Sequence, residues 1–94
     1  HYNVISYRRP PPRVGGGAAL IYTERNFFVE DANIVVEDGV EACWAIFTPK
    51  QKILPQIKRI CVGSIYIAPR SKYKQESVNH IVDTMFQIKA RYGN

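Results

Sequence analysis

The pattern of hydrophobic and polar positions divides the chain into a strand-forming part and one helix. Apolar runs rich in β-branched and aromatic residues occupy positions 18–24, 27–38, 40–48 and 57–68. Turn-forming residues separate them, notably "EDG" at positions 37–39, and the run at 27–38 is either one interrupted strand or a hairpin turning near residues 31–33. Short apolar runs bounded by such residues are typical of strands, and their spacing predicts an antiparallel meander of about four strands.

Residues 75–92 show helical periodicity instead. At about 100° per residue their apolar positions form one stripe, which we predict packs on the sheet. His80 falls opposite that stripe, so a solvated surface position is expected, and Ser71 is the expected N-cap. Lys89 and Arg91 suit the last turn of the helix. The stripe consists of Val78, Ile81, Val82, Met85, Phe86, Ile88 and Tyr92.

Positions 1–16 read as an extended lead-in. "HYNVISY" can form a short strand, but the three prolines of "RRPPPR" exclude a central strand or a helix there. That segment predicts a solvated loop carrying Arg8, Arg9 and Arg13. Gly15, Gly16 and Gly17 then allow a close backbone approach, without the lysine and hydroxyl residue of a nucleotide-binding P-loop.

Composition narrows the class of protein. The 94 residues allow one domain at most, 46% hydrophobic content favours a packed body, and a histidine in first position suggests a piece of a longer chain. Thirteen basic and eight acidic residues give a net charge of +5. This excess suits a polyanionic partner such as nucleic acid; the alternative is that it contributes only to solubility. No apolar run is long enough to span a membrane, and no signal peptide is evident.

The two cysteines, Cys43 and Cys61, lie inside apolar runs. This placement predicts buried, reduced thiols of an intracellular protein, nuclear or cytoplasmic, with a cross-strand disulfide as the alternative. Neither cysteine has the spacing of a metal ligand, so no metal site is expected. Motifs of metalloproteases and serine hydrolases are also missing.

The stretch "VGSIYIAPRSKY" carries the most specific chemistry. Tyr66 comes just before the end of a strand, where its ring can pack while its hydroxyl meets a phosphate oxygen. Arg70, Ser71 and Lys72 follow, and the two cations would face the same oxygens. The alternative is that Tyr66 is an amphipathic residue at a sheet edge and the basic turn is merely solvated.

Three motifs in order, "GGGAALIY", "EACWAIF" and "ICVGSIYIAP", followed by an amphipathic helix, carry a resemblance over about residues 15–90. The chain resembles the endonuclease/exonuclease/phosphatase superfamily, which is DNase-like, and in particular the endonuclease domain of non-LTR retrotransposon reverse transcriptases. Those domains show a glycine cluster, a Glu-x-x-Trp strand and a strand ending in Tyr-x-x-Pro, here Glu41 with Trp44 and Tyr66 with Pro69. The resemblance implies that Tyr66 contacts the scissile phosphate.

The same resemblance implies a hydrolase that cleaves phosphodiesters with a divalent metal, magnesium in the full parent domain. The family's metal-binding glutamate stands before the glycine cluster, and its Gly-Asp-x-Asn and Ser-Asp-His motifs follow the helix. This chain holds none of them, and Glu41 belongs to a different strand. We therefore expect no cofactor in this chain.

The expected fold class is α+β: an antiparallel sheet of about four or five strands with a C-terminal helix on one face, one half of an α/β/β/α sandwich. We expect one partial domain over residues 1–94, with a lead-in at 1–16, strands at 17–70 and the helix at 71–92. The other sheet face would then expose an apolar patch.

Three functions fit the sequence. The first is a fragment of a metal-dependent endonuclease, inactive alone; the second is a non-catalytic remnant that binds nucleic acid or protein. The third is an unrelated small binding domain. The expected partners are DNA, with Arg70, Ser71 and Lys72 as contacts, and either a protein or the remainder of the parent domain; no membrane is expected.

Overall fold

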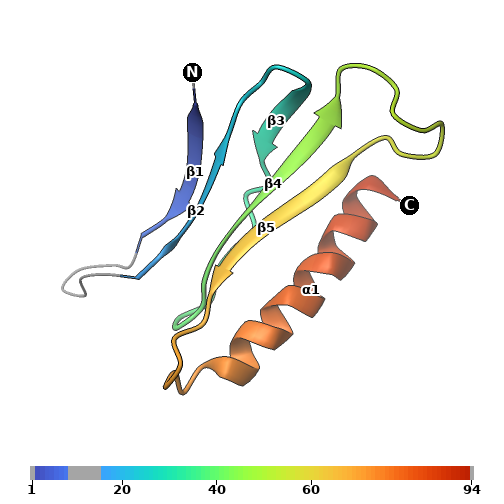
Figure 1. Cartoon of the computed structure of the whole chain (residues 1–94). Helices are drawn as coiled ribbons and strands as arrows, with labels where there is room; N and C mark the ends of the chain where they lie inside the picture. Colours follow the sequence, from blue (N-terminus) through green and yellow to red (C-terminus); the bar gives the residue numbers. More distant parts are fainter. Residues whose placement is uncertain (1, 9–15, 94) are drawn as a thin grey trace.

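The structure is a computed structural model and describes residues 2–8 and 16–93. This part of the chain forms five antiparallel strands and one helix (Figure 1). This confirms the α+β class with a C-terminal helix. The predicted strands are present, although the last one is shorter than its apolar run. The elements are β1 (Asn3–Tyr7), β2 (Ala18–Tyr22), β3 (Phe27–Asp31), β4 (Glu41–Pro49), β5 (Ile60–Tyr66) and α1 (Lys74–Tyr92).

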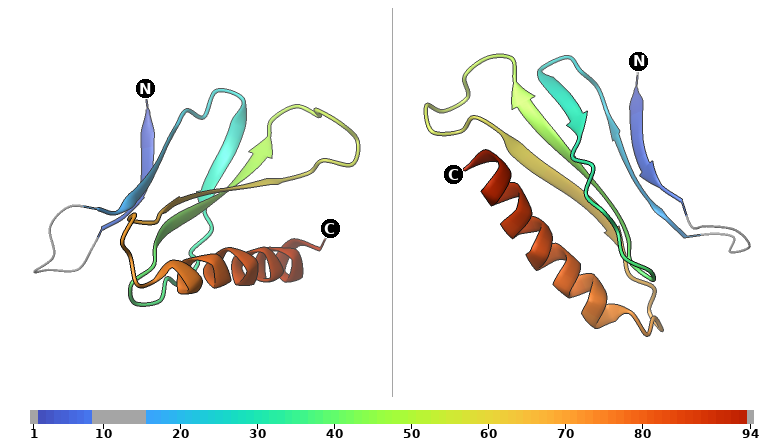
Figure 2. Two further views of the ribbon diagram at one scale, coloured as in Figure 1. Left: turned by 60° about the horizontal axis from the view of Figure 1, so that its bottom comes forward. Right: turned by 180° about the vertical axis from the view of Figure 1, so that it is seen from behind.

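The strands are divided between two sheets. β3, β4 and β5 form an antiparallel meander of three strands, not the predicted four, because β2 pairs with β1 in a separate hairpin. Figure 2 shows the hairpin on one side of the three-stranded sheet and α1 on the other. Residues 3–7 are thus the short strand expected of "HYNVISY" and not part of an extended lead-in. Arg9, Arg13 and Gly15 lie outside the described residues.

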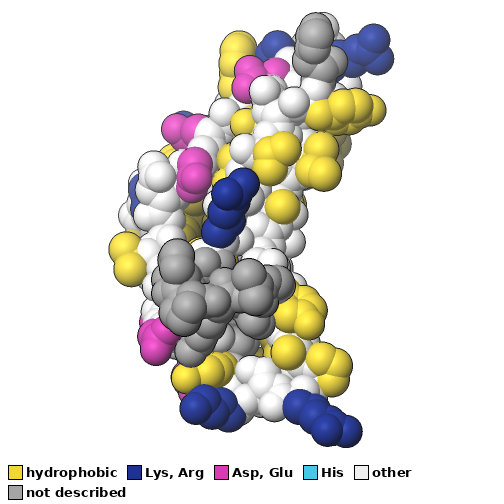
Figure 3. All heavy atoms as spheres, turned by 90° about the vertical axis from the view of Figure 1, so that its left-hand side faces the viewer, with side chains coloured by type: hydrophobic (Ala, Val, Ile, Leu, Met, Phe, Trp, Pro, Cys, Tyr) yellow, Lys and Arg dark blue, Asp and Glu magenta, His cyan; other side chains and the backbone are white. Residues whose placement is uncertain are grey.

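The core lies between the two sheets. Every second residue of the hairpin faces the meander, and Ile5 packs against Cys43 and Ala45 of β4. The expected exposed patch on this sheet face is therefore wrong, because the hairpin covers it. Hydrophobic side chains remain on the outer face of the hairpin (Figure 3). Val4 and Ile21, which are paired between β1 and β2, are both exposed. Side chains packed around the core are Tyr7, Ala18, Leu20, Tyr22, Val29 and Phe47.

The helix contacts the sheet through a different face from the one its apolar stripe predicts. Ser77, His80 and Thr84 are its buried residues, whereas Met85 and Phe86 of the stripe are 65% and 68% exposed. Val78 and Val82 are exposed as well. The predictions that these four residues are core and that His80 is solvated are wrong.

The indole of Trp44 explains this orientation of α1. Trp44 projects toward the helix from the middle of β4, and its Nε1–H donates a hydrogen bond of 2.9 Å to Nε2 of His80. An indole between sheet and helix leaves room only for small side chains opposite it, such as Ser77 and Thr84. The helix therefore turns its small polar residues inward and leaves part of its apolar stripe, Val78, Val82, Met85 and Phe86, toward solvent, while Ile81, Ile88 and Tyr92 stay partly buried.

Two turns follow the sequence signals. The Asp31 carboxylate accepts the N–H of Asn33, which has a φ of 54°, and so ends β3 where the turn was expected. Residues 34–36 do not resume a strand. At "EDG" the N–H of Val40 donates to the carbonyl of Glu37, and Gly39 has a φ of 86°.

The two cysteines lie on opposite faces of the meander. Cys43 is buried toward the hairpin, whereas Cys61 faces the helix side and is exposed, and both are free thiols. The prediction of a buried thiol is right for Cys43 and wrong for Cys61. Neighbouring strands carry them, but their side chains point apart. Within residues 2–8 and 16–93, no helix has the length and apolar character needed to cross a membrane.

Candidate nucleic-acid interface

Tyr66 is the last residue of β5 and stands at one end of the meander. Its pairing partner across the ladder is Glu41, the first residue of β4. Directly paired residues of antiparallel strands share a face, so both side chains lie on the hairpin side of the sheet. Tyr66 is 42% exposed, which leaves the phenol accessible at the rim of the molecule.

The end of the glycine cluster joins this pair. The backbone N–H of Gly17 donates a hydrogen bond to the buried carboxylate of Glu41. Gly17 has a φ of 96°, and a Cβ there would lie 2.7 Å from the carbonyl oxygen of Tyr7. Only glycine suits both conditions. The three separate sequence motifs, represented by Gly17, Glu41 and Tyr66, therefore converge at one end of the sandwich.

The basic turn between β5 and α1 follows directly. Arg70 and Lys72 are exposed, and Ser71 is half-buried. Ser71 donates its N–H to the carbonyl of Ala68 at 3.0 Å, and its hydroxyl accepts the N–H of Tyr73 at 3.0 Å. These bonds fix the shape of the turn without involving either cation.

Two expectations about this turn need correction. Ser71 is not the N-cap: α1 begins at Lys74 after Tyr73, and no side chain caps it. The ammonium of Lys72 lies 5.3 Å from the ring centroid of Tyr73, so it is attracted to that ring and not to Tyr66. Among the described residues, no hydrogen bond or ring contact joins Tyr66 to Arg70 or Lys72.

The first turn of α1 adds to the positive character of this end. Its leading N–H groups carry the partial positive charge of a helix N-terminus, and Lys74 is exposed there. Glu76 lies in the same turn and offsets part of that charge. We call Tyr66, Arg70, Ser71 and Lys72, with the start of α1, the β5–α1 corner.

Comparison with family models, with curated proteins and with solved structures finds no match for this chain. The superfamily resemblance stays a prediction on the motifs alone.

The chain does not fit a magnesium centre in its described part. Residues 2–8 and 16–93 contain no group of three or more His, Cys, Asp and Glu side chains that could hold a metal ion. The carboxylate nearest to Tyr66 along the ladder, Glu41, is 8% exposed and bound to Gly17.

Desolvation shifts the pKa of three further side chains, those of His80, Cys43 and Cys61. Burial lowers the pKa of His80, although Glu37 and Asp83 act in the opposite direction, and the neutral ring accepts the indole N–H. Desolvation also raises the pKa of both thiols; Cys43 is buried, and at the exposed Cys61 the nearby Arg91 guanidinium acts in the opposite direction.

The sequence reasoning missed a second region, the space between α1 and β5. One signal in the sequence pointed to it: a glycine inside a strand, Gly63, often marks close approach of another group. In the structure Gly63 lies directly across the ladder from Trp44. An added Cβ at Gly63 would lie 2.3 Å from the indole. The cations around this space come from both the β4–β5 connection and α1, which the sequence places far apart.

Proposed function

We propose that this chain is the phosphate-contacting part of a metal-dependent endonuclease domain of the retrotransposon reverse-transcriptase type, and that it is inactive alone. The observation that carries the proposal is the convergence of Gly17, Glu41 and Tyr66 at one end of the sandwich. These residues belong to three motifs that are far apart in sequence. Residues of one site must lie close together, and these three do. Tyr66 is also 42% exposed, and the exposed basic turn follows it in the chain.

The roles of the corner residues follow from their chemistry. The Tyr66 hydroxyl donates to a non-bridging phosphate oxygen, while Arg70 and Lys72 supply charge to the DNA backbone. Ser71 fixes the shape of the turn through its hydrogen bonds with Ala68 and Tyr73. It also contacts the DNA backbone at the edge of the corner. The N-terminus of α1 favours an anion at the same end.

The catalytic groups lie in the remainder of the parent domain. Magnesium and the residues that hold it belong to that remainder, which is therefore the partner of this chain. A nuclear or cytoplasmic location is part of the proposal, supported by the free thiols of Cys43 and Cys61.

A second candidate function is a non-catalytic module that binds a protein. The exposed apolar side chains on α1, namely Val78, Val82, Met85 and Phe86, favour it. Such a module would not need the phosphate contact at Tyr66.

The test measures binding of a fluorescent DNA duplex by anisotropy over a series of salt concentrations. We expect weak, sequence-independent binding whose logarithm falls linearly with the logarithm of salt concentration. Arg70→Ala/Lys72→Ala should reduce the slope by about two contacts. The matched control, Arg25→Ala/Lys52→Ala, removes the same charge from exposed positions near the opposite end of β4 and should leave the slope near that of the parent. Equal slopes for all three proteins would exclude the corner as the interface.

Cleavage is tested separately with supercoiled plasmid and magnesium. We expect no nicking by the 94-residue chain, because a phosphate contact without a metal or a base does not activate water. Nicking by the purified chain that is abolished by Tyr66→Phe would contradict the assignment of catalysis to the remainder of the parent domain.

A further inference from the structure

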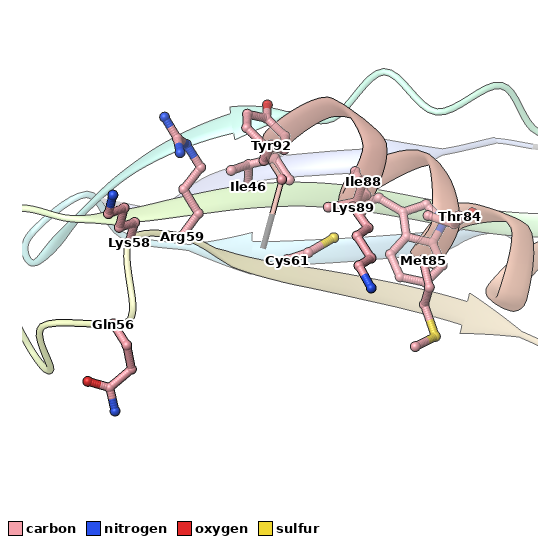
Figure 4. Close-up of a pocket in the computed structure, with 12 residues that line it drawn as sticks. Ile46, Gln56, Lys58, Arg59, Cys61, Thr84, Met85, Ile88, Lys89 and Tyr92 are labelled. Atoms are coloured by element: carbon pink, nitrogen blue, oxygen red, sulfur yellow. The ribbon is translucent and has the colours of Figure 1, made fainter.

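A groove of about 860 Å³ separates α1 from β5 (Figure 4). It exists because the helix is attached to the other two strands of the meander. Arg91 donates to the carbonyl of Ala32 at 2.7 Å, Tyr92 donates to the Glu30 carboxylate at 3.2 Å, and Trp44 is bound to His80. Cys61, on the helix side of β5, consequently stays exposed. The volume lies within the range of small-molecule sites.

The floor of this α1–β5 groove is apolar. Ile46 and Trp44 line it from β4, Cys61 from β5, and Ile88 with Met85 from α1. Burial of such side chains against an apolar ligand is favourable. A hydrophobic ligand body therefore suits the floor.

The groove also has cations along its length and at one end. Lys58 and Arg59 enter from the β4–β5 connection, and Lys89 enters from α1; Figure 4 shows the first two at the opposite end from Thr84 and Met85. The Arg59 guanidinium lies 4.8 Å from the ring centroid of Tyr92, which orients it. Among the described residues that line the groove, none is acidic, so an anionic group would meet no opposing carboxylate in the lining.

One polar atom at the apolar end has no partner. The Thr84 hydroxyl is buried without a hydrogen bond to any described residue, and Thr84 is among the residues that line the groove. An unsatisfied buried hydroxyl is unfavourable. Thr84 is 0% exposed, so its hydroxyl is not offered to a ligand, and the side chains next to it, Trp44 and Met85, offer apolar contact.

We propose that the α1–β5 groove binds an organic anion with an elongated apolar body and a single carboxylate, of the type of a medium-chain fatty acid. The carboxylate pairs with Arg59, and Lys89, whose ammonium points away from Arg59 in Figure 4, turns toward the same oxygens. The apolar body extends toward Trp44 and Met85. The helix residues that line the groove, from Thr84 to Tyr92, span about 12 Å at 1.5 Å per residue. An extended body fits this length better than a compact one. This site is separate from the β5–α1 corner.

The test titrates the isotope-labelled chain with decanoate below its micelle concentration and follows the amide and indole resonances by NMR. We expect saturable shifts at the indole N–H of Trp44 and at the amides of Cys61 and Thr84. Decanol, with the same body and no charge, should bind at least about tenfold more weakly, because charge-assisted hydrogen bonds are lost. Shifts confined to the outer face of the hairpin, or equal affinity for decanol, would overturn the proposal.

Variants locate the head group and the body independently. Arg59→Gln/Lys89→Gln should weaken decanoate at least about tenfold and leave decanol unchanged. The charge-matched control Arg25→Gln/Lys52→Gln should bind decanoate like the parent. Cys61→Phe fills the groove and should abolish binding of both ligands; circular dichroism checks its fold, and the charge variants test the proposal if it does not fold. Equal decanoate affinity in the Arg59→Gln/Lys89→Gln variant and the parent would refute the site.

Discussion

Gly63→Ala tests whether the Trp44–His80 contact organises the helix face of the sheet. Gly63 does not have a positive φ, so the effect of an added methyl group is steric. Its Cβ would lie 2.3 Å from both Cε3 and Cζ3 of Trp44, whereas carbon atoms at optimal contact are about 3.5–4.0 Å apart. The indole must therefore move by about 1 Å or more.

The expected cost follows from two effects. Overpacking of this kind costs about 1–3 kcal/mol, and displacement of the indole weakens its hydrogen bond to His80, worth about 0.5–1.5 kcal/mol. We expect Gly63→Ala to lower the free energy of unfolding by about 2–4 kcal/mol. For a chain of this size the melting temperature would fall on the order of 10–25 °C.

Urea unfolding followed by circular dichroism measures this change, and the fluorescence of Trp44, the one tryptophan of the chain, reports on the indole itself. Ser64→Ala, at the next position of β5 on the opposite sheet face, controls for an alanine in this strand. In a Trp44→Leu background the cost of Gly63→Ala should largely disappear, because no ring remains to be displaced. An unchanged cost in that background would refute the steric explanation.

Three further predictions concern other buried contacts. Stability should fall as the pH drops from about 6.5 toward 5, because burial lowers the pKa of His80 in the folded chain and the unfolded chain binds the proton more readily. His80→Gln keeps an acceptor for Trp44 and should flatten this pH dependence, measured by urea unfolding at several pH values. An equally steep dependence in the variant would assign it to other groups. Gly17→Ala should cost about 1–3 kcal/mol in thermal unfolding, since both its φ and the Tyr7 carbonyl exclude a side chain, and a neutral result would show that the chain can relax there. Thr84→Val should raise the free energy of unfolding by about 1–3 kcal/mol without ligand, because it removes a buried hydroxyl that has no partner among the described residues; a loss of stability would indicate that this hydroxyl is bonded in solution.

The candidate site was predictable in its residues but not in its geometry. Tyr66 and the basic turn are close in sequence, and the apolar run followed by Pro69 indicates where the strand ends and the turn begins. That Glu41 and Gly17 join Tyr66 depends on strand pairing between distant segments. That Lys72 lies over Tyr73 depends on the turn formed by Ser71.

The fold was predictable wherever the information is local. Alternation and turn residues determined the strands of the meander, the turns at Asn33 and Gly39, and the extent of the helix. These depend on backbone conformation over a few residues, which "EDG" or a helical periodicity specifies directly. The class α+β follows from those elements alone.

Only the tertiary structure decided which surface of each element is buried. The helix periodicity identified an apolar stripe, yet the fully buried helix residues are Ser77, His80 and Thr84, because the indole of Trp44 occupies the space between the layers. Likewise β1 covers a sheet face that the sequence left open, and Cys43 and Cys61 face opposite sides. Burial is a property of what packs against a residue, and in this chain that neighbour lies dozens of positions away in sequence.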